Sequence, residues 1–307
     1  MVDLDTFLTT VYVLVEDACH LPPDPVQPGP APSLSRGEVL TLAISSQWAA
    51  FPSERAFYRY AQRQLRGAFP RLPSRAQFNR LVRHWHDGLV AVGLQVAHWL
   101  DGATGAYQVL DGTGIVIRNS KRRGRGWLAG QATIGLCTRL GWYEGLHLLT
   151  AVTPLGAITG YGVAPAGTRD QHLAETLLAA RATPQPRLPM AGALAQCCYL
   201  VDKGFEGAAW HCRWRTHYAA HVLCPPKARS PQPWPRRLRR RHAALRQIVE
   251  TVHHRLLTSF RLEHERPHLL QGFQARLAAK VALHNLCLWI NQRSHRPLLA
   301  FADLIDW

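Results

Sequence analysis

The chain has 307 residues, which is enough for two domains with a sizeable core. It carries 36 lysines and arginines against 20 acidic residues, a formal net charge of +16, and this excess favours a polyanionic partner such as nucleic acid. No apolar run reaches the roughly 18 residues of a membrane helix. The seven cysteines form no C-x-x-C pair, which argues against structural zinc and favours reduced thiols.

Residues 1–100 are predicted to form an all-helical region, interrupted by a proline-rich linker at 21–32. The first helix is expected from residue 2 to about 19, because its apolar residues recur at helical spacing. Ser35 and Ser74 each begin a capping-box pattern, so helices are expected from these residues to about 48 and about 99. Ser53 is expected to begin a further helix between them.

The helix after Ser53 carries arginines at helical spacing, so they share one face. Short helices joined by turns, with a basic face, are typical of a helix-turn-helix-like DNA-binding unit. An ordinary solvated face explains the same pattern equally well. The arginines of this stripe are Arg55, Arg59, Arg63 and Arg66.

From about residue 105 to 295, strand patterns alternate with helical ones, which predicts an α/β domain with a mixed sheet. A short tail, 296–307, follows. Within the domain, a loop at 225–235 holds five prolines and must be exposed. The expected elements are strands at 106–117, 197–202 and 217–224, a hairpin at 146–165, and helices at 170–181, 205–214, from 236 onward and at 274–291.

Two aspartates lie at apolar strand patterns, Asp111 in VLDGTG and Asp202 in YLVDKGF. A buried carboxylate is unfavourable unless a lysine, an arginine or a divalent cation compensates it. Glu250 is the one acid in a strongly arginine-rich helix, where its partner is either Arg246 at i, i+4 spacing or a metal ion. Two strand aspartates and one helix glutamate can hold a pair of Mg²⁺ ions for in-line phosphoryl displacement.

These three motifs, VLDGTGIV, LVDKGF and IVETVHHRL, resemble in sequence and order the acidic motifs of bacterial insertion-sequence DDE transposases. The resemblance is closest to the insertion-sequence 982 group. It extends to SLSRGEVLTLAI and FPRLPSRAQFNRLV in the helical region, to the hairpin, and to RLEHERPH after the glutamate. The 4-type signature would place a tyrosine and a lysine at Ala243 and Leu257, and only its arginine, Arg246, is present.

The resemblance implies an RNase H-like catalytic domain in which Asp111, Asp202 and Glu250 bind two Mg²⁺ (or Mn²⁺) ions. It implies cleavage and strand transfer at terminal inverted repeats, by a homodimer or higher oligomer on double-stranded DNA. The expected setting is the bacterial cytoplasm, in association with the nucleoid and not with a membrane. The basic side chains predicted to contact DNA are Arg55, Arg59, Arg63, Arg66, Arg122, Arg123, Arg125, Lys203, Arg236, Arg237, Arg239, Arg240 and Arg246.

Two other functions fit the same residues. One is a related metal nuclease or resolvase that cleaves without joining, and the other is a non-catalytic DNA-binding remnant of a transposon. Among the remaining polar residues, His147 is interpreted as a core residue and Asp170 as part of a helix start. His253 and His254 are expected on the surface or facing DNA. Glu263 and Glu265 are lesser rivals of Glu250.

Overall fold

The computed structural model describes most of the chain. The predicted loop that carries Arg122, Arg123 and Arg125 and nearly all of the predicted linker at 21–32 lie outside the described residues. The described residues are 2–18, 32–48, 50–100, 105–118, 128, 130–182, 198–227, 230–266 and 268–306.

Helices form the N-terminal region, and serines begin three of them. Ser35 makes both halves of a capping box: its hydroxyl accepts from the Glu38 N–H at 3.2 Å and its own N–H donates to the Glu38 carboxylate at 2.6 Å. Ser53 and Ser74 cap the next two. The helix predicted from 75 to 99 is instead two helices, because the backbone turns at Trp85 (φ −90°, ψ 22°). The helices are α1 (Leu4–Ala18), α2 (Arg36–Ser45), α3 (Glu54–Gln64), α4 (Arg75–His84) and α5 (His86–Trp99).

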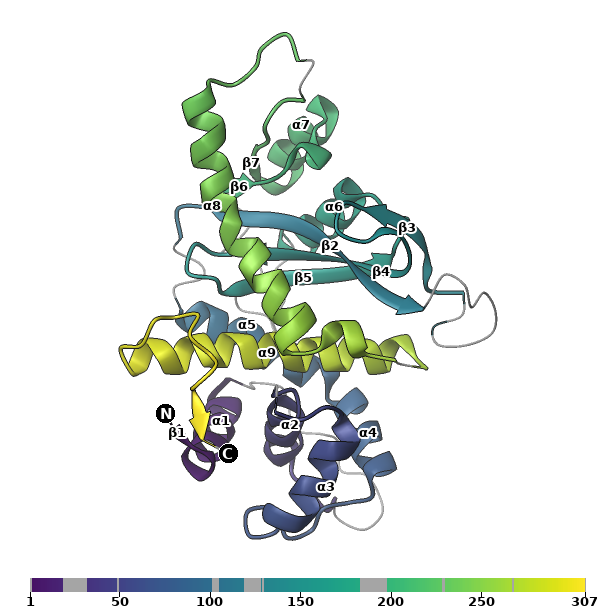
Figure 1. The fold of residues 1–307 in the computed structure, drawn as a ribbon, viewed down its shortest axis with the longest axis vertical. Helices are drawn as coiled ribbons and strands as arrows, with labels where there is room; N and C mark the ends of the chain where they lie inside the picture. The colour runs from purple at the N-terminus through teal and green to yellow at the C-terminus, as the bar shows by residue number, and fades with distance from the viewer. Residues whose placement is uncertain are drawn as a thin grey trace.

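A mixed sheet forms the centre of the second part (Figure 1). Strand β2 pairs antiparallel with β4. Strands β4 and β5 pair antiparallel and form the predicted hairpin. On the other side of β2, β6 pairs with it in parallel, and β7 pairs in parallel with β6. A further strand, β3, pairs with the start of β4 and was not predicted. This order is consistent with an RNase H-like domain. The strands are β2 (Gln108–Arg118), β3 (Thr133–Cys137), β4 (Gly141–Val152), β5 (Ile158–Pro165), β6 (Cys198–Leu200) and β7 (His221–Leu223).

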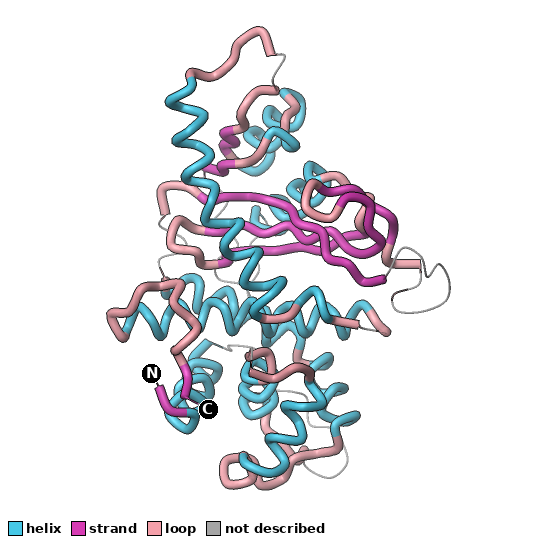
Figure 2. The backbone as a smooth tube through the Cα atoms, in the orientation of Figure 1, coloured by secondary structure: helices cyan, strands magenta, loops and turns pink. Residues whose placement is uncertain are grey.

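Both faces of the sheet are covered, because neighbouring residues on a strand point to opposite faces and both are apolar. Val109 belongs to the core shared with the N-terminal helices, whereas Leu110 belongs to a second core on the other face. Figure 2 shows helical segments on either side of the strands. They are α6 (Asp170–Ala182) and α7 (Ala208–Tyr218) on one face, and α8 (Arg236–His254) with α9 (Leu270–Arg293) on the other.

Helix α9 joins the N-terminal helices to the sheet. Its Asn285 is fully buried: the amide donates to the carbonyls of Gly93 in α5 (2.8 Å) and Ile158 in β5 (2.9 Å), and its oxygen accepts from the Ile158 N–H. The backbones of α5 and α9 approach so closely that a Cβ on Gly93 would lie 3.4 Å from the Ala282 Cα. The side chain of one asparagine therefore links α9 to backbone groups of both α5 and β5.

The two ends of the described chain meet. Strand β1 (Val2–Asp3) pairs in parallel with β8 (Ile305–Asp306), below α9 in Figure 1. Among the described residues, no helix is both long and apolar enough to cross a membrane.

Candidate active site

The register of the parallel strands places Asp111 beside Asp202. Val109 of β2 pairs with Leu200 of β6, and each aspartate lies two residues further along its chain. Because residues two apart share one face of a strand, the two carboxyl groups arise at the same level on neighbouring strands. Past the end of β6, Asp202 begins a short 3₁₀ turn (η1, Lys203–Phe205) and accepts from the Gly204 N–H at 2.6 Å.

Asp111 is the most perturbed acid of this region. Its side chain is 16% exposed, and one carboxylate oxygen lies 3.0 Å from a guanidinium nitrogen of Arg246 in α8. Burial raises the pKa of Asp111 to about 7; Arg246 opposes this, whereas the carboxylates of Asp202 and Asp170 add to it. The arginine partner considered from the sequence is therefore present, but one guanidinium does not offset burial and two neighbouring acids.

A third acid, Asp170, reaches the same place from the start of α6. Its Oδ1 lies 3.0 Å from the Nε2 of His147, and the other ring nitrogen of His147 lies 2.9 Å from the Thr168 carbonyl. Burial lowers the pKa of His147, but Asp170 and Thr168 outweigh burial and raise it above the ordinary histidine value. The pair lies against Gly112, where a Cβ would collide with both side chains.

The sequence alone indicated a core residue at His147 and a helix start at Asp170, and it did not connect the two residues. Asp170 does begin α6, yet both side chains also belong to the surroundings of Asp111. The signal that was available was the glycine directly after Asp111, since a glycine inside a strand marks a close approach of other groups.

Helix α8 crosses the sheet at the level of Asp111. The buried His253 lies 2.8 Å from the hydroxyl of Thr150, which is the register partner of Asp111 on β4. The expectation that His253 lies on the surface is therefore wrong. Residues three and four apart on a helix share a face, so Glu250 lies on the same side of α8 as Arg246 and His253.

Glu250 itself is exposed, and the structure shows no hydrogen bond or ion pair of its side chain among the described residues. The pair with Arg246 that the spacing allowed is not formed, since the guanidinium of Arg246 is bound to Asp111. The two rival glutamates both have partners: Glu263 pairs with Arg139, and Glu265 with Arg276 and Lys280.

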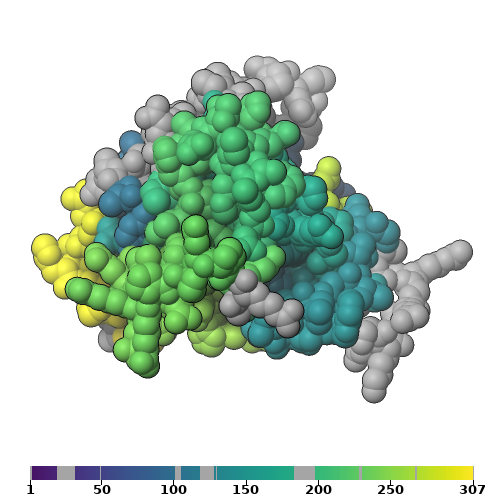
Figure 3. Space-filling view, turned by 90° about the horizontal axis from the view of Figure 1, so that it is seen from above, coloured from purple at the N-terminus to yellow at the C-terminus, as the bar shows by residue number. Residues whose placement is uncertain are grey.

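Among the described residues, the predicted DNA-contacting side chains that are exposed lie on three separate surfaces, whereas Arg246 is bound to Asp111. Lys203 is exposed next to Asp202. The first half of α8 extends beyond the sheet (Figure 1), and its Leu238 is 39% exposed. Seen from above, long side chains project from this green part of the chain (Figure 3). The exposed arginines are Arg55, Arg59 and Arg63 on α3 with Arg66 just after its end, and Arg236, Arg237, Arg239 and Arg240 on α8.

Replacing Thr150 by valine is expected to lower the free energy of unfolding by about 1–3 kcal/mol, because the buried His253 loses its partner while the side-chain shape is kept. Urea unfolding measures this. Thr251→Val is the matched control on α8, since that hydroxyl makes one long bond (3.4 Å) to a carbonyl of its own helix. Equal stability of the two variants would show that the Thr150–His253 contact does not hold α8 on the sheet.

Among the described residues, no three histidine, cysteine, aspartate or glutamate side chains lie close enough together to form a metal site as they stand. The comparison with protein families matches residues 107–286 to the family described as "Transposase DDE domain". The chain belongs to this family of DDE transposases. The match covers all the strands of the mixed sheet, Asp111, Asp202 and Glu250, and most of α9.

DDE transposases act on DNA and generally use divalent metal ions. A comparison with curated proteins gave no match. The N-terminal helices precede the matched region of this transposase.

Proposed function

We propose that this DDE transposase binds the terminal inverted repeats of an insertion sequence of the 982 group, cleaves the DNA and transfers the strands. Asp111, Asp202 and Glu250 are its catalytic residues and its ligands for two Mg²⁺ (or Mn²⁺) ions. The observation that carries the proposal is the parallel register of β2 and β6, which puts the first two acids on neighbouring strands at one level. The exposed Glu250 faces the same side from α8.

The donor chemistry fits hard divalent cations. The candidate ligands supply carboxylate oxygens only, which Mg²⁺ prefers over nitrogen or sulfur donors. Burial and the carboxylates of Asp202 and Asp170 raise the pKa of Asp111 although Arg246 is already present, so a cation bound there would favour the ionised carboxylate. When bound, such ions activate the attacking water or 3′-hydroxyl and stabilise the leaving oxygen.

Neighbouring side chains of the chain itself complete the site. Arg246 fixes the orientation of the Asp111 carboxylate through its ion pair. His147 holds Asp170 in place, and the Thr168 carbonyl in turn orients the imidazole ring. Lys203, exposed directly after Asp202, is positioned to contact a DNA phosphate near the cleaved bond.

The proposal assigns the remaining parts of the chain as follows. Residues 1–100 are the helical DNA-binding region, 105–295 the catalytic domain and 296–307 a tail. The arginines exposed on and just after α3 and on the first half of α8 contact phosphates of the duplex, and so do Arg122, Arg123 and Arg125, which follow β2 in the sequence. The transposase acts as a homodimer or higher oligomer on DNA, in the bacterial cytoplasm near the nucleoid.

Replacing Glu250 by glutamine is expected to reduce cleavage of a DNA substrate carrying the element ends by at least about 100-fold, because a neutral amide is a poor ligand for Mg²⁺. Glu263→Gln is the matched control: the same change a few residues on, at a carboxylate already paired with Arg139. Gel assays that resolve nicked, cut and joined products measure both variants. Equal loss in the two variants would remove Glu250 from the site, and cleavage by the wild type without joined products would favour the resolvase alternative.

A further inference from the structure

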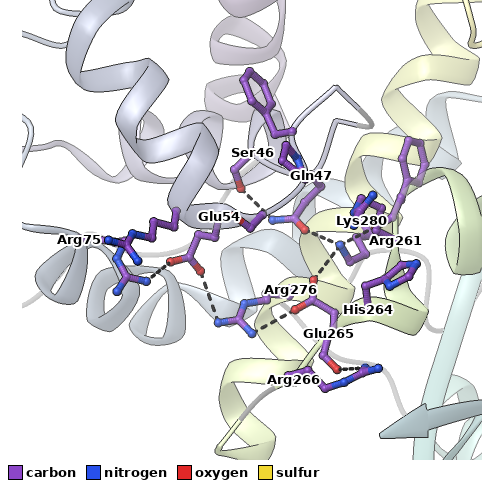
Figure 4. A pocket seen from close by; sticks show the side chains of 15 residues that line it. Ser46, Gln47, Glu54, Arg75, Arg261, His264, Glu265, Arg266, Arg276 and Lys280 are labelled. Carbon is purple, nitrogen blue, oxygen red and sulfur yellow. Dashed lines mark hydrogen bonds and ion pairs between the residues drawn. The ribbon is translucent and has the colours of Figure 1, made fainter.

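A polar cavity of about 250 Å³ lies between the N-terminal helices and the segment that joins α8 to α9 (Figure 4). Gln47, after α2, and the first residues of α3 form one wall; residues 260–266 and two side chains of α9 form the other. Because a molecule of liquid water occupies roughly 30 Å³, the cavity has room for a tetrahedral anion with its water. None of the proposed catalytic residues lines it.

The walls carry an excess of positive charge: six cationic side chains against two carboxylates give a net charge of +4, with histidine taken as neutral. Both carboxylates already have partners. Glu265 is bound by Lys280 (3.0 Å) and Arg276 (3.1 Å), and Glu54 lies 3.4 Å from Arg276. The cations that line the cavity are Arg55, Arg75, Arg261, Arg266, Arg276 and Lys280.

Lys280 fixes one side of the cavity. It is only 2% exposed, and its ammonium group lies 2.7 Å from the Gln47 side-chain oxygen, 2.7 Å from the Phe260 carbonyl and 3.0 Å from Glu265. These partners come from two segments that are far apart in the sequence, one at Gln47 and the other at 260–265. A buried ammonium with all its donors engaged holds the walls at a fixed separation, so the cavity exists before any ligand arrives.

Arg261 stands beside Lys280 in an unusual backbone conformation (Figure 4). Its φ of +58° lies in the left-handed region, which costs a non-glycine residue of the order of 1 kcal/mol. The residues before it, Arg255–Ser259, form a π-helix, another rare conformation that is frequent at functional sites. The structure shows no acidic partner for Arg261 or Arg55 among the described residues.

We propose that this cavity binds a phosphate group of the DNA backbone, an inference that rests on the proposed function and adds a contact to it. Guanidinium groups match phosphate oxygens in geometry and charge. Arg55, at the cavity, is also the first arginine of the exposed stripe on α3, so the cavity continues that surface. The duplex then contacts the protein on the N-terminal side of α9 as well as at the catalytic carboxylates on the sheet side (Figure 1).

The test uses the full chain with two of the cavity arginines neutralised, Arg55→Gln and Arg261→Asn. Asparagine tolerates the left-handed conformation at 261, and glutamine is a good helix former at 55. The control is Arg215→Gln, which removes an exposed charge from α7, at the opposite end of the molecule from α3 (Figure 1).

Affinity for a labelled duplex carrying an element end is measured over a series of salt concentrations. Each neutralised phosphate contributes about 0.9 to the slope of log Kd against log salt. Loss of one phosphate contact is therefore expected to lower the slope by about one and to weaken binding about 5- to 10-fold at moderate salt. Arg215→Gln is expected to change neither. Thermal melting without DNA checks that each variant is folded, and Arg55→Gln alone is the second variant if position 261 does not tolerate change.

Ethylation interference on the same duplex identifies the phosphate: modifying it weakens the wild type and Arg215→Gln but not the double variant. Equal behaviour of the double variant and Arg215→Gln, with a wild type that binds and cleaves, overturns the phosphate site and leaves the transposase function standing. A wild type that neither binds nor cleaves the duplex overturns the proposed function instead. Stabilisation by inorganic phosphate that depends on Arg261, with an unchanged DNA slope, assigns the cavity to a free anion and overturns the backbone contact.

Discussion

Replacing Asp202 by asparagine is expected to reduce DNA cleavage by at least about 1,000-fold, equivalent to about 4 kcal/mol of transition-state stabilisation, while DNA binding is largely kept. The loss is chemical and not structural. Asparagine keeps the side-chain oxygen that accepts the Gly204 N–H and begins η1, so the local turn is preserved. It removes the negative charge that a divalent ion needs.

The control for this variant is Glu206→Gln, four residues further on. Glu206 pairs with Lys227 at 2.9 Å and is not part of the carboxylate group around Asp111. Cleavage by Glu206→Gln is expected at the wild-type rate, and both variants are expected to bind the terminal repeats as the wild type does. Cleavage by Asp202→Asn at a comparable rate in the presence of Mg²⁺ would remove Asp202 from the catalytic site.

The strand patterns predicted two of the acids of this site, because Asp111 lies within an apolar strand and Asp202 directly follows one. Their adjacency required one further fact, that β2 and β6 are parallel neighbours in register at Val109 and Leu200, which local periodicity does not contain. The position of Asp170 near Asp111 was not predicted from the sequence for a similar reason. Its local pattern specifies only a helix start. Its closeness to Gly112 depends on the tertiary path of the chain between β5 and α6, which the local pattern does not contain.

Helical periodicity likewise predicts a helix from residue 236 onward, but it does not indicate which side chains of other elements its residues contact. Only the packing of α8 on β4 brings His253 to the Thr150 hydroxyl. The cavity at Lys280 was not visible either. Its walls come from residues separated by more than 200 positions. The left-handed backbone at Arg261 could not be predicted, because arginine is not among the residue types that favour this conformation.

Replacing Asp111 by asparagine is expected to make the protein more stable relative to the wild type as the pH rises from 5 to 8, although it abolishes cleavage. The pKa of Asp111 in the folded protein is about 7, raised from 3.8 by burial. A raised pKa means that the folded state keeps its proton longer. The contribution of Asp111 to stability is therefore fully present below about pH 3.8 and is lost as the pH rises through about 7.

Between pH 5 and 8 this loss amounts to at most about 2–3 kcal/mol, and the asparagine variant does not suffer it. The loss of the ion pair between Arg246 and Asp111 lowers the free energy of unfolding of the asparagine variant at every pH and opposes this gain. The difference in free energy of unfolding between variant and wild type therefore starts near or below zero at pH 5 and becomes more favourable to the variant by pH 8. Asp303→Asn, at an exposed carboxylate, is expected to follow the wild type.

Urea unfolding at several pH values between 5 and 8 measures the stability of the wild type and the variants. Repeating these measurements with Mg²⁺ separates the electrostatic cause from a simple packing effect. A cation bound by Asp111 favours its ionised form, so Mg²⁺ is expected to stabilise the wild type at pH 8 and to flatten its pH dependence. The asparagine variant is expected to respond little. If Asp111→Asn shows the same pH dependence as the wild type, the carboxylate is ionised without penalty and Arg246 alone compensates it. If instead the two diverge and Mg²⁺ brings them together, the fold gives up stability at Asp111 to keep a carboxylate there for a metal ion.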